Sequence, residues 1–206
     1  SIYVSSTNGE YSNLGNESVV LTNLQIDISH LNLVDSNTTG EVDASNVTSM
    51  TGSAADMNTA YTSSGISGLG NEAITLDDTS LAVATLNTLN GNTTGVVNAA
   101  TVTTLTGAAA AMNTAYTAGG NGEITNLGNE AITLDDTTLA ATVLNTLDGN
   151  TTGVVNAATV GTLTGAASDV ITSYTADSNG TISGLGNEAL TLSGNTSVAN
   201  ANTLAG

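Results

Sequence analysis

The chain has 206 residues, with 18 Asp and Glu, a single His and no Lys or Arg, which gives a formal net charge of −18. Without cationic side chains it has no strong phosphate-binding groups, so nucleic acid and anionic membrane surfaces are excluded as partners. It has no Cys, which excludes disulfides and thiolate metal sites. No apolar run approaches the ~18 residues of a membrane helix, so we expect no membrane insertion. The 39% of hydrophobic residues still allow a buried core.

The tetrapeptide Leu-Gly-Asn-Glu marks an internal repeat. It begins at four leucines spaced by 55, 58 and 58 residues: Leu14, Leu69, Leu127 and Leu185. The segment that starts at Gly70, GNEAITLDDTSLAVATLNTLNGNTTGVVNAATVTTLTG, recurs almost unchanged in the segment that starts at Gly128. Such self-similarity is the signature of a repeat architecture. We therefore expect a single repeat solenoid over residues 1–206, with units at approximately 1–61, 62–116, 117–174 and a partial 175–206.

Each repeat divides into two similar halves, and the segment from Ala131 illustrates the first. The alternation in Ala131–Leu134 predicts a strand, and Asp135–Thr137 are predicted to cap a helix that follows directly. One apolar face of this helix is formed by Leu139, Val143, Leu144 and Leu147. Gly149 stands where a left-handed C-terminal cap is expected.

The second half has the same order of elements. GVVNAATV from Gly153 predicts a strand, and Thr164 is a candidate N-cap for a helix in which Ala166, Val170 and Tyr174 share one face. Each half is then one strand, one short helix and two loops, about 29 residues in all.

A unit this small cannot bury its own apolar face, so neighbouring units must stack. We predict an α/β solenoid of about seven strand–helix half-units, with the strands in a parallel sheet. The alternative is an all-β parallel helix, because the Thr and Val residues of segments such as Val83–Leu89 favour strand over helix.

Four phrases carry a resemblance to a known class of protein: LGNEA, LDDTTLA, GNTTGVVNAATV and AAAAMNTAY. In these phrases the chain resembles the tandem repeats of very large surface or secreted proteins of cyanobacteria, and the resemblance covers essentially the whole chain. It implies a role at the cell surface, in a matrix or in a filament. It carries over no functional residue, because that class is defined by repetition.

The glutamates of the four LGNE loops, Glu17, Glu72, Glu130 and Glu188, allow two interpretations. Stacking could align their carboxylates as in calcium-binding secreted repeats, but the 58-residue period leaves successive copies two turns and about 10 Å apart. The favoured interpretation is a tight turn, in which Asn and Gly supply left-handed backbone geometry.

The candidate metal ligands are the adjacent carboxylates Asp77 and Asp78, and Asp135 and Asp136, because such pairs can chelate a hard cation such as Ca²⁺. Capping of the following helix is the favoured alternative, since acidic side chains accept backbone N–H bonds at a helix N-terminus. The first and last repeats carry Thr22–Asn23 and Ser193–Gly194 instead. A metal site would therefore be confined to the middle repeats, whereas Ser, Thr and Asn can still cap.

His30, the only histidine, stands where other repeats carry Thr85 and Val143, and is interpreted as a neutral replacement. A zinc or catalytic site would need further His or Cys partners. We therefore expect no enzymatic activity and no cofactor besides possible calcium.

These observations predict a structural protein, extracellular or at the cell surface, that forms or decorates a filament, sheath or surface layer. We expect end-to-end self-association, because Tyr3 aligns with Tyr174 and Asn202–Gly206 matches Asn145–Gly149, so both ends fall inside the repeat pattern. The alternative function is a stalk segment of an adhesin or phage fibre that binds a cell surface or polysaccharide.

Overall fold

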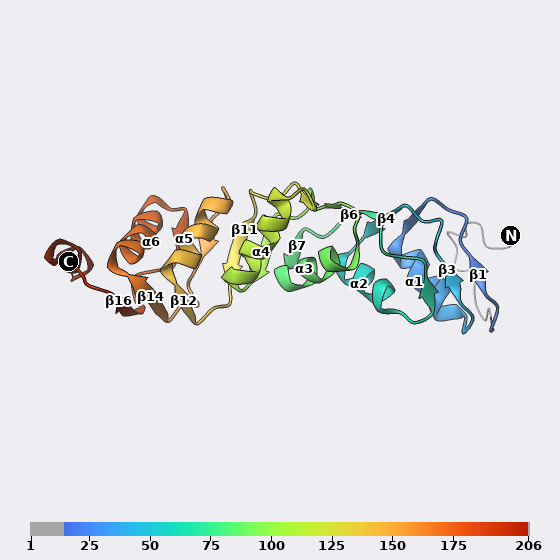
Figure 1. Cartoon of the computed structure of the whole chain (residues 1–206), viewed down its shortest axis with the longest axis horizontal. Coiled ribbons are helices and arrows are strands. Elements are labelled where there is room, and N and C mark those ends of the chain that lie inside the picture. Colours follow the sequence, from blue (N-terminus) through green and yellow to red (C-terminus); the bar gives the residue numbers. More distant parts are fainter. Residues whose placement is uncertain (1–14, 206) are drawn as a thin grey trace.

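Groups of two or three short strands alternate with single helices along residues 15–205, which are the part of the chain that the computed structural model describes. The predicted half-unit with a single strand is therefore wrong. The elements follow one another along the long axis of the molecule (Figure 1). The expectations that rest on Tyr3 and Gly206 lie outside the described residues.

The helices of the described part are α1 (Ile28–Asn37), α2 (Ala54–Thr62), α3 (Val83–Asn92), α4 (Ala109–Gly120), α5 (Ala141–Asn150), α6 (Ala167–Asn179) and α7 (Val198–Ala205). The strands of the first two repeats are β1 (Val19–Val20), β2 (Gln25–Asp27), β3 (Val42–Asp43), β4 (Ser49–Gly52), β5 (Ile66–Ser67), β6 (Ala73–Leu76), β7 (Ser80–Ala82), β8 (Val97–Asn98), β9 (Thr104–Gly107) and β10 (Ile124–Thr125). The remaining strands are β11 (Ala131–Leu134), β12 (Thr138–Ala140), β13 (Val155–Asn156), β14 (Thr162–Ala166), β15 (Ile182–Ser183) and β16 (Ala189–Ser193).

All strand pairs are parallel, and they form four sheets among the described residues instead of the single sheet that we expected. Two sheets have five strands, in the orders β2-β4-β6-β8-β10 and β7-β9-β11-β13-β15. The outer two have three strands each, β1-β3-β5 and β12-β14-β16. The strands after the two middle LGNE loops are central. β6 pairs with β4 of the preceding repeat and with β8 of its own, and β11 pairs with β9 and β13 in the same way.

Rows of apolar side chains, in register across neighbouring strands, form a large part of the core. In one five-stranded sheet the row is Ile26, Met50, Ile74, Val97 and Ile124, and in the other it is Leu81, Leu105, Ile132, Val155 and Ile182. All except the half-buried Ile26 are buried. The helices contribute residues that are fully buried at repeated positions: Leu31, Met57, Leu86, Met112, Leu144 and Val170.

Asparagines link consecutive helices. Asn58 Nδ2 donates to the carbonyl oxygen of Thr85 on the next helix at 3.0 Å, and Asn113 Nδ2 donates to that of Val143 at 3.1 Å. Asn32, Asn87 and Asn145 make the same bond. Such bonds satisfy polar groups between packed helices. In α6 the position of Asn58 and Asn113 is taken by Ile171.

The fold class α/β with parallel strands is confirmed, and helices occupy segments such as Val83–Asn92, where the all-β alternative required strands. The predicted helix start is wrong, however. Thr138–Ala140 pair with Thr162–Thr164, so α5 begins only at Ala141 and Leu139 is a buried strand residue.

Other details of the predicted helix α5 also differ. Leu144 and Leu147 are buried on it, as predicted, and Val143 is half-buried. Gly149 does not form a left-handed cap, because it lies inside α5, which ends at Asn150.

In the second half, only Val155–Asn156 of the predicted strand is extended in a sheet. Thr164 lies in β14 and does not cap α6, which begins at Ala167 after an extended Ala166. Val170 is buried on α6, and Tyr174 is half-buried.

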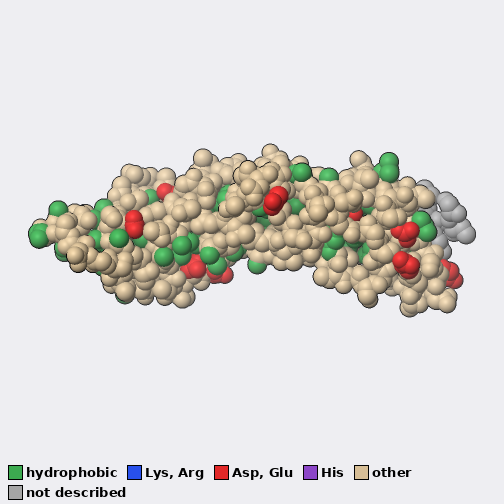
Figure 2. Space-filling model, in the orientation of Figure 1, with side chains coloured by type: hydrophobic (Ala, Val, Ile, Leu, Met, Phe, Trp, Pro, Cys, Tyr) green, Lys and Arg blue, Asp and Glu red, His purple; other side chains and the backbone are tan. Residues whose placement is uncertain are grey.

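Acidic side chains are spread along the molecule. On the face shown in Figure 2 they form small separate groups and not one continuous patch. This distribution keeps like charges apart in a chain that has no Lys or Arg to neutralise them.

Candidate functional site

Each LGNE loop lies where segments of the repeat meet. In the middle repeats the loop contacts a tyrosine of the preceding helix, Tyr61 or Tyr116, and an Asn-Thr-Thr-Gly turn, 92–95 or 150–153, which follows the next helix. We call this three-part contact the repeat junction. It is the most complete polar arrangement that recurs in the described chain.

The glutamate of the loop is the centre of the repeat junction. Glu72 and Glu130 are fully buried. Glu72 Oε2 accepts hydrogen bonds from the Gly70 N–H at 2.9 Å and from the Tyr61 hydroxyl at 2.8 Å. Glu130 Oε2 accepts from the Gly128 N–H and the Tyr116 hydroxyl, both at 2.9 Å. These donors compensate a buried carboxylate that has no cationic partner.

The Asn-Thr-Thr-Gly turn binds the backbone of the same loop. The Thr151 hydroxyl donates to the Glu130 carbonyl oxygen at 3.0 Å and accepts from the Gly153 N–H at 3.0 Å. The Thr152 N–H donates to the Gly128 carbonyl oxygen at 2.8 Å. The turns at 37–40 and 92–95 repeat this pattern on the first and second loops. These hydrogen bonds join each turn to a loop that lies 21 residues earlier in the chain.

Two positions of the junction, one in the turn and one in the loop, need glycine for geometric reasons. A Cβ at Gly153 would overlap the carbonyl oxygen of Glu130, and one at Gly95 would overlap that of Glu72. Gly128 of the loop has φ +123°, which is unfavourable for any other residue. Close backbone approach at the turn and left-handed geometry in the loop therefore both require glycine.

The tyrosines of the junction are perturbed by their surroundings. Burial raises the pKa of Tyr116, and the Glu130 carboxylate next to its hydroxyl raises it further, although Thr151 acts in the opposite direction. Burial and Glu72 raise the pKa of Tyr61 in the same way. Both hydroxyls therefore stay protonated and can donate to the glutamates.

The junction agrees with the turn interpretation of the LGNE loops only in part. The glycine has positive φ in all four loops, whereas the following asparagine does not. The sequence reasoning missed the tyrosine and the Asn-Thr-Thr-Gly turn as partners of the glutamate. Their fixed order in every complete repeat, with tyrosine before the loop and the turn 21 residues after the glutamate, was the signal that could have indicated them.

Two of the four candidate metal ligands, Asp78 and Asp136, serve as caps, but not of the predicted helix. Asp136 Oδ2 accepts from the N–H of Ala109, the first residue of α4, at 2.7 Å. Asp78 Oδ2 accepts from the N–H of Ala54, the first residue of α2, at 2.8 Å. Each therefore caps the helix of the preceding half-unit. The helices that follow, α3 and α5, have alanine N-caps without a side-chain hydrogen bond.

Asp77 and Asp135 are exposed. Among residues 15–205, no three or more His, Asp or Glu side chains are grouped so that they could hold a metal ion. His30 is exposed on α1. The N-cap of that helix is Asp27, and hydrogen bonds from Ser29 hold the pKa of its carboxyl below the usual range.

Comparison with protein-family models, with curated proteins and with solved structures finds no match to this chain. Within the described residues, no helix combines the length and apolar character that crossing a membrane requires.

Proposed function

We propose that this chain is a structural repeat protein, a solenoid of strand–helix half-units that forms or decorates an extracellular filament, sheath or surface layer by end-to-end self-association. The parallel sheets and the consecutive helix contacts support a continuous stack. The absence of Lys and Arg, which leaves no trypsin cleavage site, suits an exposed location. The resemblance to cyanobacterial surface repeats points the same way.

One observation carries the proposal: a core position of the repeat is uncovered at the last strand. Leu76 and Leu134 are each 1% exposed, whereas Leu192, at the same position in β16, is 40% exposed. Within the described residues β16 pairs with β14 alone. An apolar layer beside an unpaired strand edge favours joining to another repeat.

Exposed apolar side chains are also found near the first strands. Val20 is 61% and Leu24 is 63% exposed, beside β1 and β2. The surfaces at the two ends of the described chain are different, and contacts between unlike surfaces that do not close into a ring propagate into filaments.

Electron microscopy and sedimentation velocity of the 206-residue chain test this proposal. We expect fibres from the parent chain and monomers from Leu192→Asp, because the substitution places a charge in the end contact. Val154→Asp is the matched control: Val154 is 45% exposed but lies in a central repeat, so its variant should still form fibres. A chain that stays monomeric at all concentrations would overturn self-association and favour the stalk of an adhesin or phage fibre.

A further inference from the structure

The sequence contains seven Asn-x-Ser/Thr tripeptides, the acceptor pattern for N-linked glycans. Their asparagines are Asn16, Asn37, Asn46, Asn92, Asn150, Asn179 and Asn195. Three of them, Asn37, Asn150 and Asn179, also have an aspartate two positions earlier. Bacterial oligosaccharyltransferases require such an acid, which pairs with a cationic side chain of the enzyme. These three asparagines are therefore the strongest candidates in the sequence.

Asn37 and Asn150 are engaged within the fold. Asn37 Nδ2 donates to the Leu33 carbonyl oxygen at 2.7 Å, and Asn150 Nδ2 donates to Asn113 Oδ1 at 3.0 Å. The threonine two positions after each asparagine donates, through its N–H and its hydroxyl, to the glycine carbonyl of an LGNE loop. Modification of either asparagine would therefore require the repeat junction to open.

Asn179 is held much less. It is exposed at the end of α6, and no hydrogen bond within the described residues holds its side chain. Gly180 follows with φ +81° and ends the helix. The Thr181 N–H and hydroxyl both donate to the Ala176 carbonyl oxygen, at 3.1 and 3.3 Å. Only this last helical turn must open to release the tripeptide, and helix ends open at little cost in free energy.

The exposure of Asn179 does not result from its place near the end of the chain. In the preceding repeat the same position, at the end of α4, is held by Asn121. Helices α3 and α5 pack on the two sides of α4, and Asn121 is nevertheless exposed. The position therefore stays accessible when repeats are stacked on both sides. Asn121 is not itself a candidate, because Glu123 stands where Thr181 follows Asn179.

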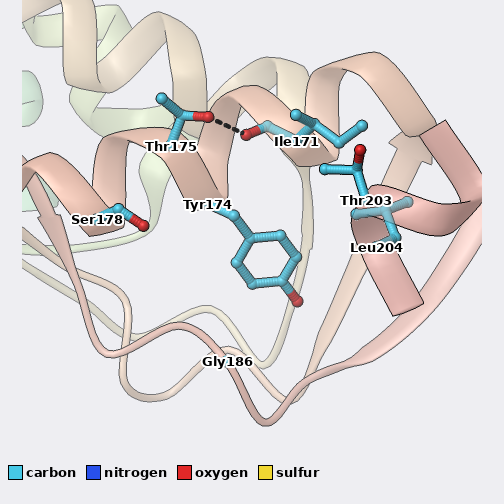
Figure 3. A pocket seen from close by; sticks show the side chains of 7 residues that line it. All are labelled: Ile171, Tyr174, Thr175, Ser178, Gly186, Thr203 and Leu204. Carbon is cyan, nitrogen blue, oxygen red and sulfur yellow. Dashed lines mark hydrogen bonds between the residues drawn. The ribbon is translucent and has the colours of Figure 1, made fainter. Parts of the chain in front are cut away.

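The neighbouring helix α7 also leaves Asn179 accessible. Ser178, the residue before it, lines a cavity between α6 and α7, together with Tyr174 and Leu204 (Figure 3). Among the described residues, Asn179 is not one of those that line this cavity. The contact between α6 and α7 thus does not cover the Asn179 side chain.

We propose that Asn179 is an acceptor for an N-linked glycan, which an oligosaccharyltransferase transfers from a lipid-linked oligosaccharide. In this reaction Asn179 Nδ2 forms a bond to the anomeric carbon of the oligosaccharide and loses one proton. The bond from that carbon to the lipid pyrophosphate breaks, and the pyrophosphate leaves with the electron pair.

Asp177 is the acid that the enzyme recognises. The chain has no Lys or Arg, so this carboxylate has no cationic side chain of either kind to pair with before the enzyme binds. Asp177 Oδ1 accepts one hydrogen bond, from the Leu185 N–H at 3.2 Å, and a carboxylate has sites for several more.

The test uses the folded 206-residue chain, a bacterial oligosaccharyltransferase and its lipid-linked oligosaccharide. The intact mass shows how many glycans are added. Chymotryptic cleavage after Tyr174 then separates Asn150 from Asn179, so peptide mass spectrometry can locate them. We expect a single glycan on Asn179, and its loss in Asn179→Gln and in Asp177→Ala. Circular dichroism checks that both variants melt as the parent chain does.

Two controls lie within the same chain. Asn195 is exposed, but Ser193 stands two positions before it, so it should stay unmodified if the acid is required. Asn37 and Asn150 have the acid and should be modified only in short peptides, residues 33–41 and 146–154, where the fold no longer holds them.

A folded chain that receives no glycan at Asn179 would overturn the proposal, whatever the peptides do. Modification of folded Asn37 or Asn150 to the same extent as Asn179 would overturn the selection by the fold. Retention of the glycan in Asp177→Ala would overturn the role of the acid. None of these measurements involves self-association, so they leave the proposed function to its own test.

Discussion

Two glycines four residues apart, Gly149 and Gly153, are expected to respond to alanine with opposite signs. In Gly153→Ala the new Cβ would overlap the Glu130 carbonyl oxygen. Relief requires the turn to move away from the LGNE loop and to weaken the bonds that Thr151 and Thr152 make there. Overpacking of this kind costs about 1–3 kcal/mol, and each weakened hydrogen bond adds up to about 0.5–1.5 kcal/mol.

In Gly149→Ala the new Cβ meets no atom within 4 Å, and the backbone is already helical. Alanine restricts the unfolded chain more than glycine, so this variant should gain about 0.5–1 kcal/mol. For a chain of this size, each kcal/mol shifts the melting temperature by about 2–4 °C.

Thermal unfolding followed by circular dichroism, with calorimetry as a check on two-state behaviour, measures both variants against the parent chain. Destabilisation of Gly149→Ala would show that this glycine is a left-handed cap, as the sequence alone suggested. Parent-like stability of Gly153→Ala would refute the close approach of turn and loop.

Four further predictions concern single residues and ions. Asp136→Ala should destabilise by about 0.5–2 kcal/mol, because α4 loses its cap, whereas exposed Asp135→Ala should cost less than about 0.5 kcal/mol; equal losses in urea unfolding would contradict capping. The pKa of Tyr116 is raised in the folded state, so its contribution to stability is present below the ordinary value of 10.0 and is lost as pH rises above it. As pH rises above 10.0, the melting temperature of Tyr116→Phe should therefore fall less than that of the parent chain. If both melting temperatures fall equally with pH, the hydroxyl of Tyr116 is not buried as described. Leu144→Asp should cost about 4 kcal/mol or more by burying a charge, against less than about 0.5 kcal/mol for His30→Ala, and the reverse ranking in melting temperatures would refute the helix face. Calcium chloride should raise the melting temperature more than sodium chloride of matched ionic strength, because the carboxylates have no basic partners. Coincident unfolding curves in the two salts would mean that calcium acts only by screening the charges.

The repeat and its alternation of strand and helix could be predicted because both are local. The 58-residue period can be read directly from the amino-acid sequence. The spacing of Leu144 and Leu147 places them on one face of a helix. Side-chain periodicity of this kind survives in any tertiary context that buries one face.

The boundaries between strand and helix could not be predicted, because they depend on partners elsewhere in the chain. Thr138–Ala140 would suit the first turn of a helix, yet they pair with Thr162–Thr164 of the next half-unit. Two-residue strands such as Val155–Asn156 are too short to show an alternation. In both cases pairing with a neighbouring strand decides the conformation.

The polar contacts of Asp136 and Glu130 could not be predicted from the sequence for a similar reason. Asp136 caps a helix that begins 27 residues before it, and a local reading assigns an acidic pair to the helix that follows. The Tyr116 hydroxyl and Glu130 are 14 residues apart across a loop. Only the stacking of half-units brings these groups together.

Fibre diffraction from oriented assemblies of the 206-residue chain tests the central claim, end-to-end stacking, most directly. The sheets extend along the long axis of the molecule (Figure 1), so the spacing between strands, about 4.8 Å, lies along that axis. End-to-end assembly predicts this reflection on the meridian, parallel to the fibre axis. Finding it on the equator would mean that molecules associate side by side, and would contradict the account.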